Sequence, residues 1–92
     1  MPCRRIISIG RDVRSDYKLD STAVSSDHAL LIVGDGHQHL LIDRNSRNGT
    51  RVAGVDGGSR IRQRLVSSHE EVFFGDANCM VRDILVRAGI RD

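Results

Sequence analysis

A chain of 92 residues with 39% hydrophobic side chains can form one domain with a modest core. Only 3% of the residues are aromatic, so that core must consist mainly of Val, Ile and Leu, which favour strands. The net charge of +2 arises from 12 acidic and 14 basic residues mixed along the chain, which argues against a nucleic-acid partner but is compatible with a partner that carries a few phosphates.

Three strands are predicted in the first half of the chain. Residues 4–9 are predicted as a short strand with β-branched residues that ends at Gly10. A polar stretch follows, in which Tyr17 is a candidate anchor into the core. Residues 29–33 are apolar throughout, which predicts a strand buried on both faces or packed between two sheets. A Gly-Asp-Gly turn then leads into residues 39–42 as the second arm of a hairpin.

The second half continues with short segments separated by turns. A brief strand is predicted at 52–55, a loosely alternating one at 61–66, a glycine-terminated one at 71–74 and a last one at 79–86. No window sustains a long apolar period of 3.6 residues. Short strands with a turn signal about every 8–12 residues are typical of an all-β sandwich or barrel, with at most a turn or two of helix.

The cysteines and histidines give little sign of a cofactor or metal. Cys3 and Cys79 lack CxxC spacing and are predicted to be free thiols of a reducing compartment; a disulfide would require the first and last strands to pair. His37 and His39 have no third ligand near them, which favours a solvated hairpin. No segment resembles a signal peptide or a membrane span, so we expect a cytoplasmic protein without a membrane partner.

Polar clusters stand at three predicted strand ends. In chain order they read Ile9-Gly10-Arg11, Val24-Ser25-x-x-His28-Ala29 and Asp43-x-x-Ser46-x-Asn48-Gly49-Thr50. This order and spacing resemble the forkhead-associated (FHA) domain, over about residues 4–86 of a chain that we expect to be one domain from 1 to 92. The resemblance implies a two-sheet β-sandwich, a short strand at 15–19, neighbouring first and last strands, and loops at one end that bind a phosphothreonine peptide.

The resemblance also implies roles for individual residues. Arg11 matches the family arginine that reaches the phosphate or braces its loop, and Ser25 matches the serine whose hydroxyl bonds a phosphate oxygen. Asn48 matches the asparagine that bonds the peptide backbone beside the phosphoresidue. The residues expected to support the site are Gly10, His28 and Gly49. The histidine would tie the binding loops together, and the glycines would allow close approach or a positive φ.

Three positions in or near the predicted site depart from the family pattern, and His69-Glu70, far from the site, stands where Gly-Asp is usual. Ser26 stands where arginine or asparagine is common, which removes a side chain that often adds to the phosphate site. Arg47 stands where threonine is frequent, and its guanidinium either replaces the lost contact or projects into solvent. Ala53 stands where asparagine is frequent, which loosens the loop scaffold. Ser26 and Arg47 remain in the predicted phosphopeptide site.

The function implied is that of a phosphothreonine-dependent signalling adaptor. The alternative is an FHA-like structural or assembly module that has lost phosphate dependence, which Ser26 and Ala53 favour. Nucleic-acid binding rests only on the pI near 8.9. A hydrolase triad of Ser25, His28 and Asp43 would lack a G-x-S-x-G elbow and room for a substrate, so we expect no enzymatic activity.

Overall fold

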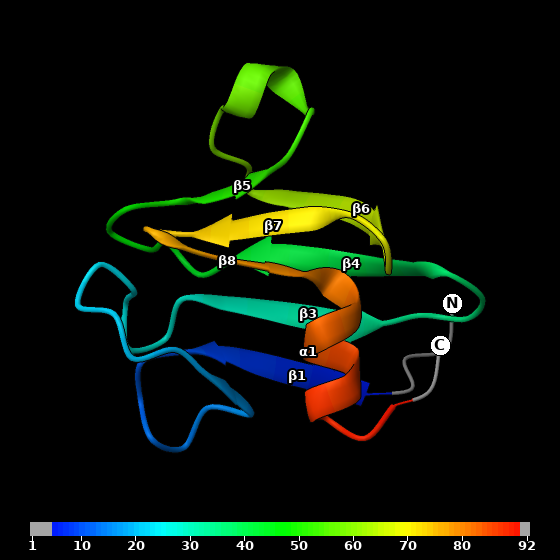
Figure 1. The fold of residues 1–92 in the computed structure, drawn as a ribbon, viewed down its shortest axis with the longest axis horizontal. Coiled ribbons are helices and arrows are strands. Elements are labelled where there is room, and N and C mark those ends of the chain that lie inside the picture. The colour runs from blue at the N-terminus through cyan, green and yellow to red at the C-terminus, as the bar shows by residue number, and fades with distance from the viewer. Residues whose placement is uncertain (1–4, 91–92) are drawn as a thin grey trace.

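Two β-sheets face each other in the computed structural model, which describes residues 5–90 (Figure 1). The larger sheet has five strands in the order β2-β1-β3-β4-β6, and the smaller has three in the order β5-β7-β8. The predicted two-sheet β-sandwich is therefore confirmed. The elements are β1 (Arg5–Gly10), β2 (Tyr17–Lys18), β3 (Ala29–Val33), β4 (Gln38–Asp43), β5 (Thr50–Val52), the 3-10 turn η1 (Asp56–Gly58), β6 (Gln63–Ser67), β7 (Glu71–Phe74), β8 (Ala77–Met80) and α1 (Val81–Arg87).

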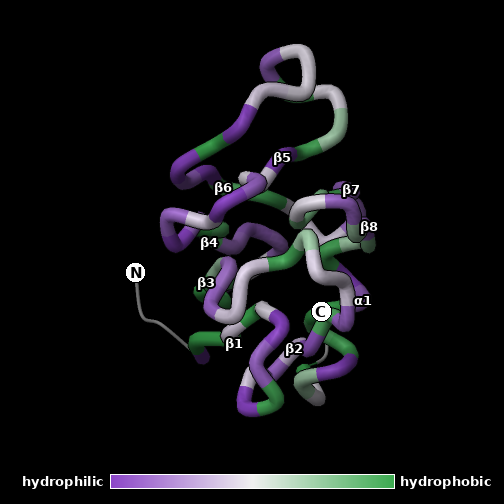
Figure 2. Tube along the Cα trace, turned by 90° about the vertical axis from the view of Figure 1, so that its left-hand side faces the viewer, coloured by the Kyte–Doolittle hydropathy of each residue, from purple (hydrophilic) through white to green (hydrophobic). Residues whose placement is uncertain are grey.

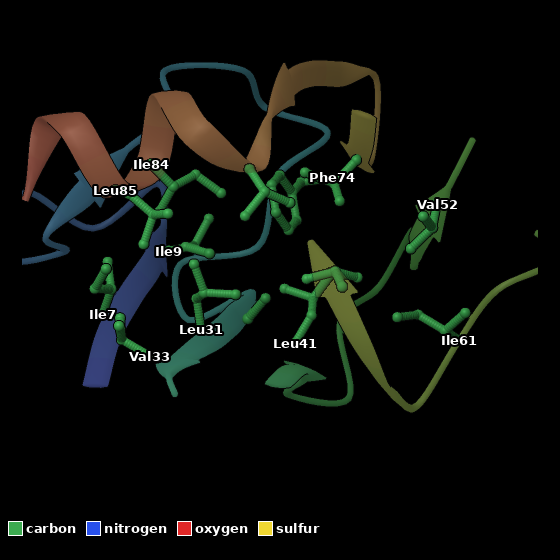
Figure 3. Close-up of a cluster of buried hydrophobic side chains, with 14 of the residues drawn as sticks. Ile7, Ile9, Leu31, Val33, Leu41, Val52, Ile61, Phe74, Ile84 and Leu85 are labelled. Carbon is green, nitrogen blue, oxygen red and sulfur yellow. The ribbon is translucent and has the colours of Figure 1, made fainter. Parts of the chain in front are cut away.

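The apolar strands of the larger sheet bury only one of their two faces. In β3, Leu31 is fully buried whereas Leu30 and Ile32 are only partly buried, because alternate side chains point to opposite faces. Ile6 of β1 lies on the same outer face and is 54% exposed. The prediction that residues 29–33 are buried on both faces or packed between two sheets is wrong, since the smaller sheet and α1 both pack on the inner face (Figure 3).

Strand register gathers the polar connections at one end of the sandwich. Ile9 pairs with Ala29, and Ala29 pairs with Asp43, so the end of β1, the start of β3 and the end of β4 lie in one row. The connection before β3 and the connection after β4 therefore emerge side by side. Residues 11–28, which include the short strand β2, and residues 44–49 form these two connections, which carry most of the predicted site.

Helix α1 completes the second layer of the sandwich. Strands lie about 4.8 Å apart, so the two extra strands of the larger sheet leave roughly 10 Å uncovered, about the diameter of a helix. Ile84 and Leu85 are fully buried and face Ile7 and Leu31 of the larger sheet (Figure 3). The short helix thus covers apolar surface that three strands cannot reach.

The predicted strand at 79–86 is wrong in its second half. β8 ends at Met80, and α1 follows directly. Val81, Ile84 and Leu85 recur at the spacing of one helical face, and all three are buried. The Asp83 carboxylate accepts a hydrogen bond from the Met80 N–H at 2.9 Å, which caps the first turn. The β-branched Val and Ile residues suggested a strand, but tertiary packing favours the helix.

The first and last strands are not neighbours, which corrects a second prediction. β1 pairs with β2 and β3, whereas β8 pairs only with β7 in the other sheet. The two ends of the described chain nevertheless meet, because Arg5 Nη1 donates to the carbonyl oxygen of Ala88 at 2.5 Å. Cys79 is a free thiol, and Cys3 lies outside the described residues.

Two other predicted strands are shorter than expected. β2 occupies only two residues of the predicted 15–19 segment and runs parallel to β1, while Tyr17 packs against the core as predicted. β5 ends at Val52 rather than at 55, because Gly54 takes a φ of 74° and the Val55 N–H turns back to the Val52 carbonyl. The connection from 53 to 62 then projects beyond the sheets, with mostly hydrophilic or neutral residues (Figures 1 and 2). No helix within residues 5–90 is long and apolar enough to cross a membrane.

Truncating the buried face of α1 should destabilise the whole domain. Leu85→Ala removes a fully buried side chain and should lower the free energy of unfolding by about 2–5 kcal/mol. The neighbouring Val86 is 66% exposed, so Val86→Ala should change it by less than about 0.5 kcal/mol. Urea unfolding followed by circular dichroism measures both, and equal effects would show that α1 does not pack on the larger sheet.

Candidate functional site

All five residues predicted to contact a phosphopeptide line one hollow of about 210 Å³ at the strand ends. The hollow lies between the connection that precedes β3 and the loop that follows β4. Its lining residues are Arg11, Thr22, Ala23, Val24, Ser25, Ser26, Arg47 and Asn48. Among them are two arginines and no acidic residue, so the hollow is positively charged.

Arg11 is bonded to one wall of the hollow through both its backbone and its side chain. Its backbone N–H donates to the Ser25 carbonyl at 3.0 Å, and its side-chain Nε donates to the Val24 carbonyl at 3.1 Å. The residue is exposed, and its Nη groups donate to no other described residue. One face of the guanidinium is thereby fixed while the remaining N–H groups stay available to an anion.

Gly10 and Gly49 serve the backbone functions that the sequence predicts, in two different ways. A Cβ on Gly10 would lie 2.2 Å from the Ser26 carbonyl oxygen, so no side chain fits between β1 and the 22–26 segment. Gly49 has a φ of 87°, which other residues rarely adopt, and the Arg60 side chain lies against it. Both walls of the hollow therefore depend on glycine.

His28 joins the two walls from below. It is fully buried, and its Nδ1 accepts a hydrogen bond from the Ser25 N–H at 3.1 Å. The ring proton must then sit on Nε2, which donates to the Gly49 carbonyl at 2.9 Å. The ring also meets Phe74 edge to face, with 5.6 Å between centroids. This is the burial and loop-to-loop bonding that the sequence predicts for His28.

The side chains of Ser25 and Asn48 connect the two walls of the hollow directly. The Ser25 hydroxyl accepts from the Arg47 N–H at 3.0 Å and keeps its own proton available. Asn48 Nδ2 donates to the Ala23 carbonyl at 2.8 Å, a loop-closing contact that sequence reasoning missed. The Arg47 guanidinium is exposed and contacts no hydrogen-bonding or acidic group among residues 5–90.

Asp43 holds the 43–50 loop in shape, a role that the sequence analysis did not assign. Its carboxylate accepts from the Ser46 N–H at 3.0 Å, the Ser46 hydroxyl at 2.5 Å and the Thr50 hydroxyl at 2.7 Å. The Ser46 hydroxyl in turn accepts from the Gly49 N–H at 3.0 Å. Burial alone would raise the pKa of Asp43, but the hydrogen bonds from Ser46 and Thr50 outweigh it and lower the pKa.

The other chemistries raised by the sequence do not fit these contacts. Both ring nitrogens of His28 bond backbone groups, so the ring cannot take a proton from the Ser25 hydroxyl. His39 is only 2% exposed, and its Nδ1 accepts from the Gly34 N–H, which corrects the prediction of a solvated hairpin. Within residues 5–90, no group of three His, Cys, Asp or Glu residues could hold a metal ion. Ala53 is exposed and does not line the hollow.

Acid should weaken the fold through Asp43. A carboxyl whose folded pKa is depressed contributes stability above its unfolded pKa, here near 3.8, and loses it as the pH falls through the folded value. Asp43→Asn should lower the free energy of unfolding at pH 7 by about 1–3 kcal/mol and flatten its decline in acid. Urea titrations from pH 7 to pH 2 measure both effects. Asp35→Asn, in the exposed β3–β4 turn, is the control and should match the wild type.

Removing the His28 ring should destabilise the domain rather than only the site. His28→Ala leaves the Ser25 N–H and the Gly49 carbonyl without their buried partner, at about 1–3 kcal/mol in the free energy of unfolding. His69→Ala, at an exposed position, should change it by less than about 0.5 kcal/mol. Thermal or urea unfolding compares the two, and a His28→Ala variant as stable as wild type would contradict the bridging role.

Comparisons with known proteins agree on one family. The sequence model of the FHA domain family matches residues 7–75 of this chain. No curated protein sequence matches the chain. Among solved structures, the FHA domain of CT664 from Chlamydia trachomatis is 25% identical, with a TM-score of 0.72 over 85% of this chain and 75% of that one.

Two further structures are similar and were solved in studies of phosphorylated ligands. Mycobacterium tuberculosis EmbR, in complex with a low-affinity phosphopeptide, is 25% identical with a TM-score of 0.69; the match covers 82% of this chain but only 19% of EmbR. A domain from a structural and functional analysis of phosphothreonine-dependent FHA domain interactions is 27% identical, with a TM-score of 0.70 over 82% of this chain and 73% of that one. With the family model spanning most of its length, this chain belongs to the FHA domain family.

Proposed function

We propose that this domain binds phosphothreonine-containing proteins or peptides in the hollow between residues 22–26 and 47–48, and that it acts as an interaction module rather than an enzyme. The observation that carries the proposal is the hollow itself, in which two guanidinium groups and a serine hydroxyl surround a space without any acidic lining residue. A phosphate of about −1.5 to −2 charges needs such donors. Two similar structures support the same proposal: EmbR, solved in complex with a phosphopeptide, and a domain from an analysis of phosphothreonine-dependent FHA domain interactions.

The predicted binding residues keep polar groups that no contact within residues 5–90 uses, and these groups define their proposed roles. Arg11, held by the Val24 carbonyl, offers its Nη groups to phosphate oxygens, and the Ser25 hydroxyl donates its proton to another. Asn48 uses one Nδ2 proton to bond the Ala23 carbonyl, which leaves its second Nδ2 proton and its Oδ1 available to the peptide backbone. Arg47 supplies a guanidinium beside Ser26, whose own side chain is short.

A phosphate-independent assembly module is the second candidate. The contact that favours it is the bond from Asn48 to the Ala23 carbonyl, because a hollow that closes its own loops needs no ligand to hold its shape. Against it stand the donors that the same loops leave unused. The two candidates differ in whether binding depends on phosphate.

Loss of Arg11 should weaken phosphopeptide binding strongly. Hydrogen bonds to a charged group contribute about 1.5–3 kcal/mol, so Arg11→Ala should raise Kd by roughly 10- to 150-fold. Its bond to Val24 adds at most about 1 kcal/mol to the cost in folding, which urea unfolding checks separately. Calorimetric titration with matched Thr, phosphothreonine and Glu peptides, selected from a degenerate library, measures the effect. Arg82→Ala removes the same charge from the exposed surface of α1 and should leave Kd unchanged.

Arg47→Ala in the same titration tests whether this arginine replaces the group missing at Ser26. If it does, Kd should rise and the salt dependence of binding should decrease. A change in binding free energy below about 0.5 kcal/mol would show that the Arg47 side chain projects into solvent and does not contact the phosphopeptide. A natural partner that binds equally well after phosphatase treatment, and equally well to Arg11→Ala, would overturn the phosphothreonine proposal in favour of the assembly module.

A further inference from the structure

A second, larger hollow of about 520 Å³ lies on the other side of the 43–50 loop. Its lining residues are Asp43, Asn45, Arg60, Ile61 and Arg62, which come from the end of β4, the loop and the connection that precedes β6. The loop is thus a shared wall, with Arg47 and Asn48 on one side and Asp43 and Asn45 on the other. None of the predicted phosphopeptide residues lines this second hollow.

Arg60 is fixed against the loop although it is exposed. Its Nη2 donates to the Ser46 carbonyl at 2.7 Å, and its aliphatic stem lies against Gly49, where even a Cβ would come within 2.8 Å of its Cγ. Only glycine leaves room for the arginine in this position. The other N–H groups of the Arg60 guanidinium have no acceptor among the described residues. Arg60 therefore presents donors to the hollow from a held position.

Arg62 and Asp43 are the other two charged residues that line this hollow. The backbone of Arg62 is anchored, because its carbonyl accepts from the Asp43 N–H at 2.8 Å, while its exposed guanidinium has no hydrogen bond or ion pair within residues 5–90. The one carboxylate, of Asp43, is already bonded by Ser46 and Thr50. Two arginines with unused donors thus face one carboxylate whose oxygens are occupied.

We propose that this second hollow binds a second anionic side chain of the same phosphorylated partner, either an Asp or Glu carboxylate or another phosphate. The inference rests on the proposed function, since it places the phosphothreonine in the first hollow. The 43–50 loop lines both hollows, so a peptide that crosses this loop passes from the first hollow to the second. Ile61, which is 9% exposed and lines this hollow, can contact the aliphatic part of such a side chain, while Arg60 and Arg62 bond its acidic end.

The test is a scan of acidic positions in a phosphothreonine peptide. The Cα positions of the domain extend over 32 × 31 × 19 Å, and ten extended residues at about 3.3 Å each span the longest dimension. A single Asp, with its isosteric Asn control, is therefore placed at each of ten positions on either side of the phosphothreonine. Asp should lower Kd about two- to five-fold relative to Asn at one or two adjacent positions, the range of an exposed ion pair. Phosphoserine at the same positions distinguishes a second phosphate from a carboxylate as the preferred anion.

Matched variants assign the effect to the hollow. Arg62→Gln should abolish the Asp-over-Asn preference while the phosphothreonine-over-Thr preference remains. Arg60→Gln should also abolish the Asp-over-Asn preference, but it removes the bond to the Ser46 carbonyl as well, so Arg62→Gln is the variant that separates the two preferences. Arg64→Gln makes the same charge change at an exposed position of β6 outside the hollow and should retain both preferences. A flat Asp scan, or a preference that survives both Arg62→Gln and Arg60→Gln, would overturn this inference alone. A wild-type domain that does not distinguish phosphothreonine from Thr would instead overturn the proposed function together with this inference.

Discussion

One buried imidazole holds the candidate site in register with the sheets. The His28 backbone N–H donates to the Ile9 carbonyl at 3.0 Å, and its carbonyl accepts from the Arg44 N–H at 2.9 Å, so the residue is fixed to β1 and to the end of β4. Its ring then bonds Ser25 on one loop and Gly49 on the other. Because the ring is rigid and fully buried, the two loops cannot separate without leaving polar groups unpaired in the core. The width of the first hollow is thus a property of the fold.

Asp43 holds the interior of one loop together by hydrogen bonds, as His28 holds two loops together. Its carboxylate collects donors from Ser46 and Thr50, and both of these side chains are buried. The polar residues of the loop therefore divide into an inner set that bonds itself and an outer set, Arg47 and Asn48, that faces the hollow. A loop that is satisfied internally can display unsatisfied donors at its rim without collapsing onto them.

The sequence predicted most of the residues that line the first hollow, but it predicted the pairing of the strands and the last helix less well. The polar clusters at strand ends located the first hollow, because turn residues and strand ends can be recognised locally. The sequence did not predict the helix at Val81–Arg87, because two turns are too short for a clear apolar period and its Val and Ile residues also suit strands. The bond from Asn48 to Ala23 and the contact of Arg60 with Gly49 were also missed, because they join residues far apart in sequence. For the same reason the second hollow has no local signature.

The arginines around the 43–50 loop differ in how much freedom they would lose on binding. Arg11 donates one N–H to the Val24 carbonyl and Arg60 donates one to the Ser46 carbonyl, so each guanidinium is partly ordered before a ligand arrives. Arg47 has no such anchor, and ordering a free arginine side chain costs up to about 2 kcal/mol. An equal set of phosphate contacts should therefore contribute less net affinity from Arg47 than from Arg11. Where a loop carbonyl holds the guanidinium, part of the side-chain entropy is already lost in the free domain, so less of it is lost on binding.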